Sequence, residues 1–421
     1  MYSKSDNINP HGSRAPQMQD SQLSMPQSHL DGLDVLVVGA GIGGLTAAIW
    51  LTVCGCRVRV FEAAAELREV GAGVSLGPNA TRVLRAGGVL EALAACASRP
   101  SQQVVQSWDG QILVSAAPNA ATDPAGYLQV HRADLQQTLA VALERLAPGA
   151  LRLGQAVATC EPDARRPQIV LQGGGTVEAD LVVGADGVHS VVRRSLFADE
   201  PPSFTGIVAY RGLVPRERLP VLESQSPSGL TIGAGRSFLR YMIRGGEMLN
   251  FAAFVSTPRW EQEGWSVACE RSELEEHFAG AHGDVQKVLA AAPGTMLHKW
   301  GLFARRPLDR WTRGRITLLG DAAHPMLPFL GQGASMAIED GCILARAIAQ
   351  LPNIDSALDA YERLRLPRAN AIAAASSARA AAVQSGRPEV YGSHLAANAS
   401  VRQENLFTYD APQLELAPQT A

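Results

Sequence analysis

The stretch from residue 33 to residue 62 constrains the fold more than any other part of the chain. It begins with a short apolar, β-branched run at residues 33–38, whose length suits a buried strand better than a helix. A Gly-x-Gly-x-x-Gly sequence follows at residues 39–44, and residues 45–51 have the character of a helix. A second apolar run at residues 57–61 completes the unit. The order of these pieces predicts a strand–helix–strand unit.

Each glycine of the motif has its own physical role in such a unit. Gly39 permits the tight turn, Gly41 lets the backbone approach a pyrophosphate, and Gly44 lets the helix pack closely against the strand. The helix N-terminus offers N–H groups and the positive end of its dipole to phosphates. Glu62 follows Gly44 by 18 residues, where a carboxylate can accept hydrogen bonds from a ribose. The motif predicts a dinucleotide site without choosing between NAD and FAD, and a turn that binds nothing is the alternative.

The overall composition argues against several other classes of function. The net charge of −3 and the pI of about 6.3 do not favour nucleic acid or an anionic membrane surface as a partner. The first 30 residues are polar and lack the apolar core of a signal peptide. We therefore expect a disordered tail over residues 1–32 and a cytoplasmic protein. The six cysteines are scattered without metal-binding spacing, so we expect reduced thiols and no metal site.

Two later segments repeat the strand–turn–helix character, and a different pattern lies between them. Residues 179–197 combine a buried strand, a glycine-rich turn and a helix, and residues 315–351 do the same around a loop with two prolines. Residues 204–256 alternate like antiparallel strands. Within them, residues 239, 241 and 243 are expected to share one face because side chains alternate along a strand. The chain of 421 residues is long enough for two interleaved domains with tails.

The sequence contains three separated motifs and a fourth, shorter segment with an arginine: Gly39–Gly44 with Glu62, Gly184–Ser190 with Arg193, Gly320–Pro325 with Pro328 and Gly331–Ala334, and His131–Leu135. The first three together resemble the single-component FAD-dependent aromatic hydroxylases, the salicylate hydroxylase-like group of flavoprotein monooxygenases. The fourth also resembles an arginine-containing segment of that family, and the similarity runs from about residue 33 to residue 370.

The resemblance implies an α/β fold, with a Rossmann-type FAD-binding domain, an inserted antiparallel β-sheet substrate domain and C-terminal helices. The FAD-binding domain would comprise residues 33–200 and 300–351. The substrate-binding sheet would comprise residues 201–299, and a C-terminal helical segment and tail would comprise residues 352–421.

The resemblance also implies one FAD, bound tightly and non-covalently, with NADH or NADPH and O₂ as transient co-substrates. The sequence has no second complete Gly-x-Gly-x-x-Gly motif, which agrees with a nicotinamide that only visits. Asp321 would accept hydrogen bonds from the ribityl chain, Arg132 would meet a phosphate, and Asp186 would lie near the pyrophosphate. The cofactor-binding residues expected on this basis are Gly39, Gly41, Gly44, Glu62, Gly73, Arg132, Asp186, Gly187, Gly320, Asp321, Pro328, Gly331, Gly333 and Ala334.

The reaction implied by the resemblance is oxygen transfer from a flavin C4a-hydroperoxide to an electron-rich ring. The substrate would be a small aromatic acid, such as a hydroxybenzoate, salicylate or hydroxypyridine carboxylate. Tyr210 and Tyr241 would position it, with Ser75 and Arg211 in the same pocket. A place in the core for the two tyrosines, or a solvated strand position for Arg211, is the alternative.

Two other functions remain open at this point. The same flavin chemistry could act on a larger secondary metabolite, by hydroxylating a polyketide phenol or epoxidising an alkene. A more remote alternative is a non-catalytic binding protein with a flavin-type fold. The expected assembly is a monomer or a homodimer.

Overall fold

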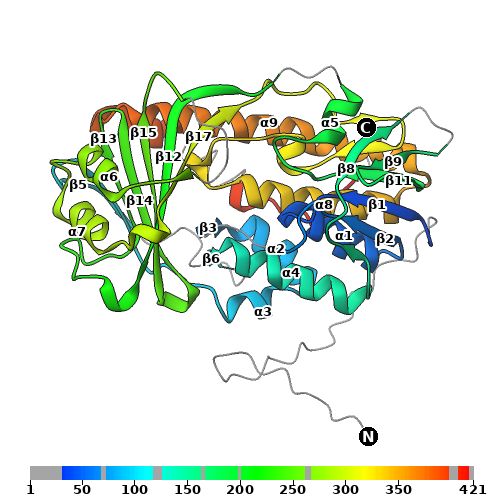
Figure 1. The fold of residues 1–421 in the computed structure, drawn as a ribbon, viewed down its shortest axis with the longest axis horizontal. Helices are drawn as coiled ribbons and strands as arrows, with labels where there is room; N and C mark the ends of the chain where they lie inside the picture. Colours follow the sequence, from blue (N-terminus) through cyan, green and yellow to red (C-terminus); the bar gives the residue numbers. More distant parts are fainter. Residues whose placement is uncertain are drawn as a thin grey trace, which may run out of the picture.

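The protein folds into two lobes that lie side by side, with one long helix running along both (Figure 1). The predicted tail at residues 1–32 lies outside the described residues, except for its last two. The computed structural model describes residues 31–67, 73–116, 126–162, 166–197, 201–260, 267–397 and 406–416.

The first lobe is built on a six-stranded sheet with the order β18-β19-β11-β1-β2-β7. All neighbours in it run parallel except β18, which pairs antiparallel at the edge. Strands covered on both faces read as continuous apolar runs, which explains the run at residues 33–38. The strands are β1 (Asp34–Val38), β2 (Arg57–Phe61), β7 (Leu151–Arg152), β11 (Leu181–Gly184), β18 (Thr312–Arg313) and β19 (Ile316–Leu318).

Helices cover this sheet and pack closely upon one another. The helix after the glycine motif begins at Ile42, three residues before the predicted start, because Gly43 and Gly44 lie inside it. A Cβ atom on Gly341 would come within 2.7 Å of the backbone nitrogen of Ala47, so two helix backbones nearly touch there. The helices of this lobe are α1 (Ile42–Val53), α2 (Pro78–Ala86), α3 (Leu90–Ala94), α4 (Arg132–Leu146), α5 (Val191–Leu196) and α8 (Gly333–Gln350).

Two small sheets complete the first lobe. One is a two-stranded ribbon that lies between the lobes (Figure 1), and the other is a three-stranded antiparallel sheet. Their strands are β3 (Gly73–Leu76) with β6 (Leu128–His131), and β8 (Val157–Glu161), β9 (Gln168–Leu171) and β10 (Thr176–Glu178).

The second lobe is an eight-stranded sheet with the order β16-β17-β12-β15-β14-β13-β4-β5. It is antiparallel except for the parallel pair β13–β4. Two helices, α6 (Arg271–His277) and α7 (Gly283–Ala291), pack on its outer face (Figure 1). The strands are β4 (Gln103–Ser107), β5 (Ile112–Ala116), β12 (Ser203–Pro215), β13 (Gly229–Gly233), β14 (Arg236–Ile243), β15 (Met248–Ser256), β16 (Val267–Ala268) and β17 (His298–Ala304).

The predicted boundaries of the substrate domain are therefore too narrow. The strands β4 and β5 join its sheet, although residues 33–200 were assigned to the other domain. The strand β17 also crosses the predicted limit at residue 299. The pairing of β4 with β13 joins residues more than 100 positions apart, and no local pattern in the sequence signals it.

The C-terminal part of the chain returns to both lobes. The helix α9 (Ile354–Gln384) continues through Pro367, and α10 (Pro388–Ala397) packs against it. Residues 406–416 then pack on the first lobe, where Arg82 donates to the carbonyl of Phe407 and Arg346 to that of Ala411. This segment thus forms part of the core rather than an isolated tail.

No helix in the described part of the chain is both long enough and apolar enough to cross a bilayer. Among the same residues, no group of three or more His, Cys, Asp or Glu side chains could hold a metal ion.

Candidate active site

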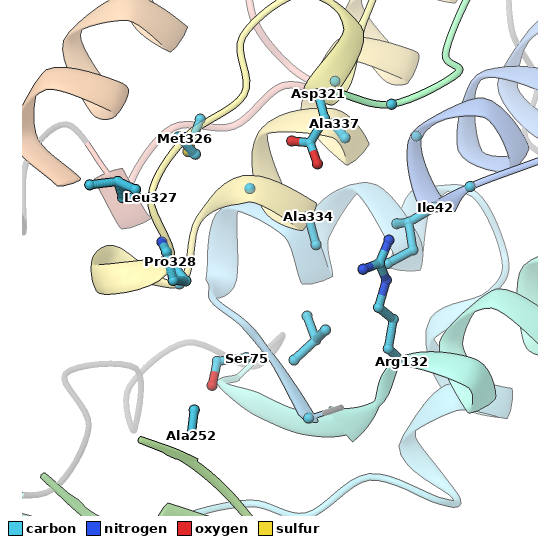
Figure 2. Close-up of a pocket in the computed structure, with 18 of the residues that line it drawn as sticks. Ile42, Ser75, Arg132, Ala252, Asp321, Met326, Leu327, Pro328, Ala334 and Ala337 are labelled. Atoms are coloured by element: carbon cyan, nitrogen blue, oxygen red, sulfur yellow. The ribbon is translucent and has the colours of Figure 1, made fainter. Parts of the chain in front are cut away.

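A cavity of about 280 Å³ lies where the carboxyl ends of β1, β11 and β19 meet the inner face of the eight-stranded sheet. The carboxyl edge of a parallel sheet is the usual place for a ligand in such folds. Figure 2 shows the cavity enclosed by segments that are distant in sequence. Of the expected site residues, it brings together Gly41, Gly73, Ser75, Arg132, Gly187, Arg211, Tyr241, Gly320, Asp321, Pro328, Gly331, Gly333 and Ala334.

The glycines of the first motif meet different surroundings. Gly39 has φ 102°, and a Cβ atom there would lie 2.5 Å from the carbonyl oxygen of Ala185. A Cβ atom on Gly44 would lie only 2.0 Å from the carbonyl oxygen of Gly39. Gly41, by contrast, has φ −69°, and its added Cβ would meet nothing within 4 Å. Gly41 is therefore required neither by its backbone nor by its protein neighbours, and its open side faces the cavity.

Glu62 does not line the cavity but supports its rim from the end of β2. Its carboxylate accepts hydrogen bonds from the backbone N–H of Ala40, at 2.7 Å, and from that of Ala64, at 2.9 Å. The carbonyl of Ala40 in turn accepts from the side chain of Gln136 at 2.9 Å. Gln136 was missed by the sequence analysis, and it fixes the glycine turn to α4.

Arg132 opens α4 and extends from the cavity wall. In Figure 2 its guanidinium lies beside Ile42, at the start of α1, which is where the phosphates of a dinucleotide would meet the helix N-terminus. The contact of Arg132 with a phosphate stays a prediction.

Asp186 is turned away from the cavity. Its carboxylate accepts from the backbone N–H groups of Val191, at 2.7 Å, and Val192, at 3.2 Å, and from the hydroxyl of Ser190. Burial raises the pKa of this carboxyl, although these hydrogen bonds act in the opposite direction. Asp186 thus caps α5 and does not line the cavity, while its neighbour Gly187, with φ 75°, does.

The third motif places a carboxylate and a helix N-terminus on the cavity wall. The Asp321 side chain is exposed, and Figure 2 shows it directed into the space beside Ala334 and Ala337 of α8. Gly331 takes a left-handed conformation with φ 64°, which turns the chain into α8 at Gly333. The positive end of the α8 dipole therefore faces the cavity, where it would stabilise an anionic ring edge.

A buried network of charges lies behind this wall and was missed by the sequence analysis. Arg365 of α9 donates to Asp340 at 2.8 Å and to Glu339 at 2.6 Å, and both Arg365 and Asp340 are 0% exposed. Nε2 of His324 lies 2.6 Å from Asp340, which also accepts from the backbone N–H of Gly320. Burial raises the pKa of Asp340, but the charges of His324 and Arg365 outweigh it and hold the pKa at about 2. His324 is thus held in this network and does not line the cavity.

The inner face of the eight-stranded sheet supplies the other wall. The ring of Tyr241 packs directly on Gly73, where a Cβ atom would lie 2.5 Å from it. The backbone N–H of Gly73 donates to Asn250 at 2.8 Å, which fixes the approach of β3 to the sheet. Burial raises the pKa of the Tyr241 phenol, so it remains a neutral hydrogen-bond donor at neutral pH. Arg211 lies 4.3 Å above the ring of Trp300 and also faces the cavity.

Tyr210 lies on the opposite face of the sheet and does not line the cavity. The expectation that Tyr210 positions the substrate is therefore wrong. The hydroxyl of Tyr210 donates to Glu273 of α6 at 2.7 Å. The reason is the alternation of side chains along β12, which sends Tyr210 and Arg211 to opposite faces. The same alternation sends Arg240 outward from β14, where it pairs with the buried Asp284 at 2.8 Å.

A second cavity of about 310 Å³ adjoins the first and extends between the sheet, α9 and α10. Its walls are mostly apolar, and its lining includes Arg379 of α9, Tyr391 of α10 and Phe407 from the C-terminal segment. The sequence analysis identified none of these three, because no motif marks them. The residues that line both cavities are Ser75, Leu239, Tyr241, Phe254, Pro328 and Gly331.

The described residues suit FAD on several independent grounds. The open side of Gly41, the helix N-termini of α1 and α8, and the carboxylate of Asp321 all lie on one cavity. Gly41 and the α1 N-terminus suit a pyrophosphate, Asp321 suits a ribityl chain, and the α8 N-terminus suits a flavin edge. A parallel sheet with such a cavity, roofed by a second sheet, defines an FAD-dependent oxidoreductase of the hydroxylase class.

Comparisons with known proteins agree with this class. A family model described as FAD binding domain matches residues 32–376, and the chain belongs to this family. The chain is 38% identical over 340 residues to 3-amino-4-hydroxybenzoate 2-monooxygenase PtnB3 of Streptomyces platensis, covering 79% of this chain and 84% of the relative. It is 34% identical over 348 residues to 6-hydroxynicotinate 3-monooxygenase of Pseudomonas fluorescens, covering 80% and 89%.

A solved structure shows the same fold. The crystal structure of Klebsiella pneumoniae HpxO complexed with FAD and uric acid superposes with a TM-score of 0.76 at 25% identity, covering 90% of this chain and 96% of that chain. The protein is an FAD-dependent aromatic-ring monooxygenase that uses NADH or NADPH and O₂, and the predicted fold class is confirmed.

Proposed function

We propose that this monooxygenase hydroxylates a small aromatic acid, either a hydroxybenzoate, which can also carry an amino group, or a hydroxypyridine carboxylate. The observation that carries the proposal is the junction of the two cavities. There Ser75 and Tyr241 present polar groups between apolar walls, and Arg211 lines the first cavity together with them and with Gly333 at the N-terminus of α8. A single aromatic ring with one hydroxyl group and one carboxyl group matches that arrangement. The activities for which both sequence relatives are named support the same substrate class.

The cofactor supplies electrons taken from NADH or NADPH, together with activated oxygen, and the chain's own residues hold and orient the substrate. The neutral phenol of Tyr241 donates a hydrogen bond to the ring oxygen of the substrate. Arg211 lies near Tyr241, and its positive charge stabilises negative charge on that oxygen, which makes the ring more electron-rich. Leu239 and Phe254 exclude water from the junction, which would limit loss of the activated oxygen as H₂O₂.

The binding residues divide between the two ends of the cofactor. Gly41, Arg132 and the α1 N-terminus would hold the pyrophosphate, and Glu62 keeps the glycine turn in place. Asp321 would bind the ribityl hydroxyls, and the α8 N-terminus would face the pyrimidine edge of the ring.

We also propose that the enzyme acts in the cytoplasm. The support is the cysteine chemistry: all six thiols are free, and burial is the main factor that raises the pKa of Cys54 and Cys56 to about 12. Buried, protonated thiols without disulfides suit a reducing compartment.

The test is a substrate panel with the purified holoenzyme. NADH and NADPH oxidation would be followed with 3-amino-4-hydroxybenzoate, 6-hydroxynicotinate, 3-hydroxybenzoate and salicylate, while H₂O₂ is measured in parallel. We expect one of these acids to stimulate oxidation with little H₂O₂ and to yield a hydroxylated product. If none of these acids stimulates the oxidation of NADH or NADPH, the proposal is contradicted.

The second cavity supports one alternative, which is the same chemistry on a larger secondary metabolite. Its volume of about 310 Å³, which includes the junction, could take a second ring or a chain. Stimulation by polycyclic phenols, without stimulation by any single-ring acid, would favour this alternative.

A further inference from the structure

Two neutral polar side chains in the wall of the second cavity have no hydrogen-bond partner among the described residues. The side-chain amide of Gln129, on β6, makes no hydrogen bond there, and only 2% of this residue is exposed. The hydroxyl of Ser237, on β14, also lacks a partner, and this residue is 0% exposed. Buried polar groups are normally paired, because an unpaired one destabilises the folded state. Two such groups in one cavity wall indicate a ligand that supplies the missing partners.

The register of the β3–β6 ribbon places Gln129 beside the junction of the two cavities. Side chains alternate along a strand, so Leu128 and Val130 enter the apolar core of the first lobe and Gln129 faces the other way. The antiparallel partner of Gln129 is Ser75, which lines both cavities. Residues paired in this way have Cβ atoms about 4.5–5.5 Å apart. The amide of Gln129 therefore lies close to the position that we assign to the reacting ring.

The amide of Gln129 is not needed to hold the ribbon together. The backbone N–H and carbonyl groups of Gln129 and Ser98 exchange two hydrogen bonds, each 2.8 Å long. These bonds are independent of the side chain, so an apolar residue could occupy the same buried position. The presence of glutamine there is explained by a polar group that it can bind in the cavity.

Ser237 approaches the junction from the eight-stranded sheet. It shares one face of β14 with Leu239 and Tyr241, because side chains two positions apart lie on the same side of a strand. The antiparallel partner of Ser237 on β15 is Phe254. Leu239, Tyr241 and Phe254 all line both cavities, whereas Ser237 and Gln129 line only the second. A ring held at the junction would therefore direct one of its substituents toward these two residues.

The chemistry of the two side chains limits the kind of substituent that they can bind. Gln129 offers two N–H donors and a carbonyl acceptor, and the hydroxyl of Ser237 rotates to donate or to accept. A methyl group would leave both side chains unpaired. A carboxylate only accepts hydrogen bonds, so it would leave the carbonyl of Gln129 unpaired. An amino or hydroxyl group can donate to that carbonyl, and Ser237 can then complete the contact.

We propose that Gln129 and Ser237 form a neutral subsite for a second, uncharged substituent of the ring, an amino or hydroxyl group next to the reacting hydroxyl. This role deepens the proposed function and rests on it. The reacting hydroxyl meets Tyr241 at the junction, and the neighbouring substituent lies in the second cavity, between β6 and β14. The subsite thus selects among aromatic acids by a group that the reaction itself does not change.

The test compares ligands that differ only in this substituent. The holoenzyme is titrated with 3-amino-4-hydroxybenzoate, 3,4-dihydroxybenzoate and 3-methyl-4-hydroxybenzoate, and the flavin absorbance is followed. The methyl compound has nearly the same size but cannot form hydrogen bonds through the substituent. We expect the wild-type enzyme to bind the amino or the hydroxyl compound at least about fivefold more tightly than the methyl compound, because the methyl group leaves buried polar groups unpaired.

Two substitutions remove the subsite while nearly keeping its volume. Gln129→Met should reduce the preference over the methyl compound at least about fivefold, and Ser237→Ala about two- to fivefold. In both variants the Kd of the methyl compound should change less than about threefold. Because the hydroxyl of Ser237 has no partner among the described residues, Ser237→Ala should not lower the midpoint of thermal unfolding.

A matched control is Gln102→Met, which makes the same exchange on the surface. Gln102 is exposed, donates to Ser115 at 2.7 Å and lines neither cavity, so the preference should stay at its wild-type value. FAD content and thermal unfolding are measured for every variant. If Gln129→Met does not fold, Ser237→Ala alone decides the comparison.

The outcomes separate this role from the proposed function. Equal weakening of all three ligands in Gln129→Met and Ser237→Ala would show that the two residues only shape the cavity, and an unchanged preference would also overturn the subsite. If the wild-type enzyme binds the three acids with equal affinity, the subsite fails and the proposed function stands. If the wild-type enzyme binds none of these acids and none of the acids in the substrate panel, both fail.

Discussion

Alanine substitutions at two glycines of one motif should have opposite effects on stability and on FAD binding. They test whether the cofactor approaches the backbone at Gly41. Gly41 and Gly44 are three residues apart, and alanine at either position adds one methyl group. At Gly44 that methyl group would lie 2.0 Å from the carbonyl oxygen of Gly39 and 3.2 Å from the Cβ atom of Ala185. At Gly41 it would meet no protein atom within 4 Å.

For the protein without FAD, Gly44→Ala should be clearly destabilising. Overpacking against a fixed backbone costs about 1–3 kcal/mol, and the contact at Gly44 is severe enough for the upper part of that range. The reduced entropy of the unfolded chain offsets about 0.4–1 kcal/mol of it. We therefore expect a net loss of about 2 kcal/mol in the free energy of unfolding.

Gly41→Ala should leave the free energy of unfolding of the FAD-free protein nearly unchanged. Its backbone, with φ −69° and ψ 178°, is one that alanine adopts readily. The entropic gain of about 0.4–1 kcal/mol is balanced by the poorer helix-capping ability of alanine, which costs a similar amount. The net effect should stay within about 1 kcal/mol of zero.

The affinity for FAD should respond differently. At Gly41 the methyl group projects into the space where the pyrophosphate would lie, and an overlap that costs about 1–3 kcal/mol raises the Kd about 5- to 150-fold. The assays are urea unfolding of the cofactor-free protein and titration with FAD, followed by flavin fluorescence. If Gly41→Ala destabilises the cofactor-free protein as much as Gly44→Ala, or binds FAD with wild-type affinity, the reasoning is refuted.

Three further predictions use the same preparations. Asp321→Ala should weaken FAD binding about 10- to 150-fold through loss of charge-assisted hydrogen bonds, and full flavin occupancy in the purified variant would contradict the assignment. Tyr241→Phe should raise the substrate Kd about three- to tenfold and increase H₂O₂ release, whereas Tyr210→Phe, on the other face of the sheet, should do neither. Asp340→Asn tests the buried network. In the folded protein the pKa of Asp340 is about 2, below its ordinary value of 3.8. The ionised carboxylate therefore stabilises the folded state above about pH 4, and this stabilisation is lost as the pH falls through 2. Urea unfolding should therefore show a loss of about 2 kcal/mol or more at pH 7 that narrows between pH 4 and pH 2, and a pH-independent difference would refute the charge argument.

The motifs of the cofactor site could be predicted because their signals are local. Gly39, Gly41 and Gly44 act through a turn and a helix start within a few residues, and Gly331 acts through its own left-handed backbone. The same locality explains why the start of α8 and the position of Asp321 on the cavity wall could be expected from sequence.

The pairing of distant residues could not be predicted in the same way. Arg363, Arg365 and Arg379 all lie on α9, and nothing in the sequence separates the one that pairs with Asp340 from the one that lines a cavity. Asp186 was expected near the cofactor, but it caps the short helix α5, which begins a few residues later. The motif alone is compatible with either role.

The sequence by itself determined the first strand–helix–strand unit and its dinucleotide site, because those depend on glycine conformations and apolar runs that neighbouring residues fix. The flavin and the chemistry could be expected from sequence only because three separated motifs together resemble one family. Only the tertiary structure decided the shape of the substrate pocket. The register of β12 against β15 sets Tyr210 outward and Arg211 inward, and the pairing of β4 with β13 brings a second cavity against α9 and α10. Such contacts depend on which surfaces bury one another in the whole chain, and no short segment carries that information.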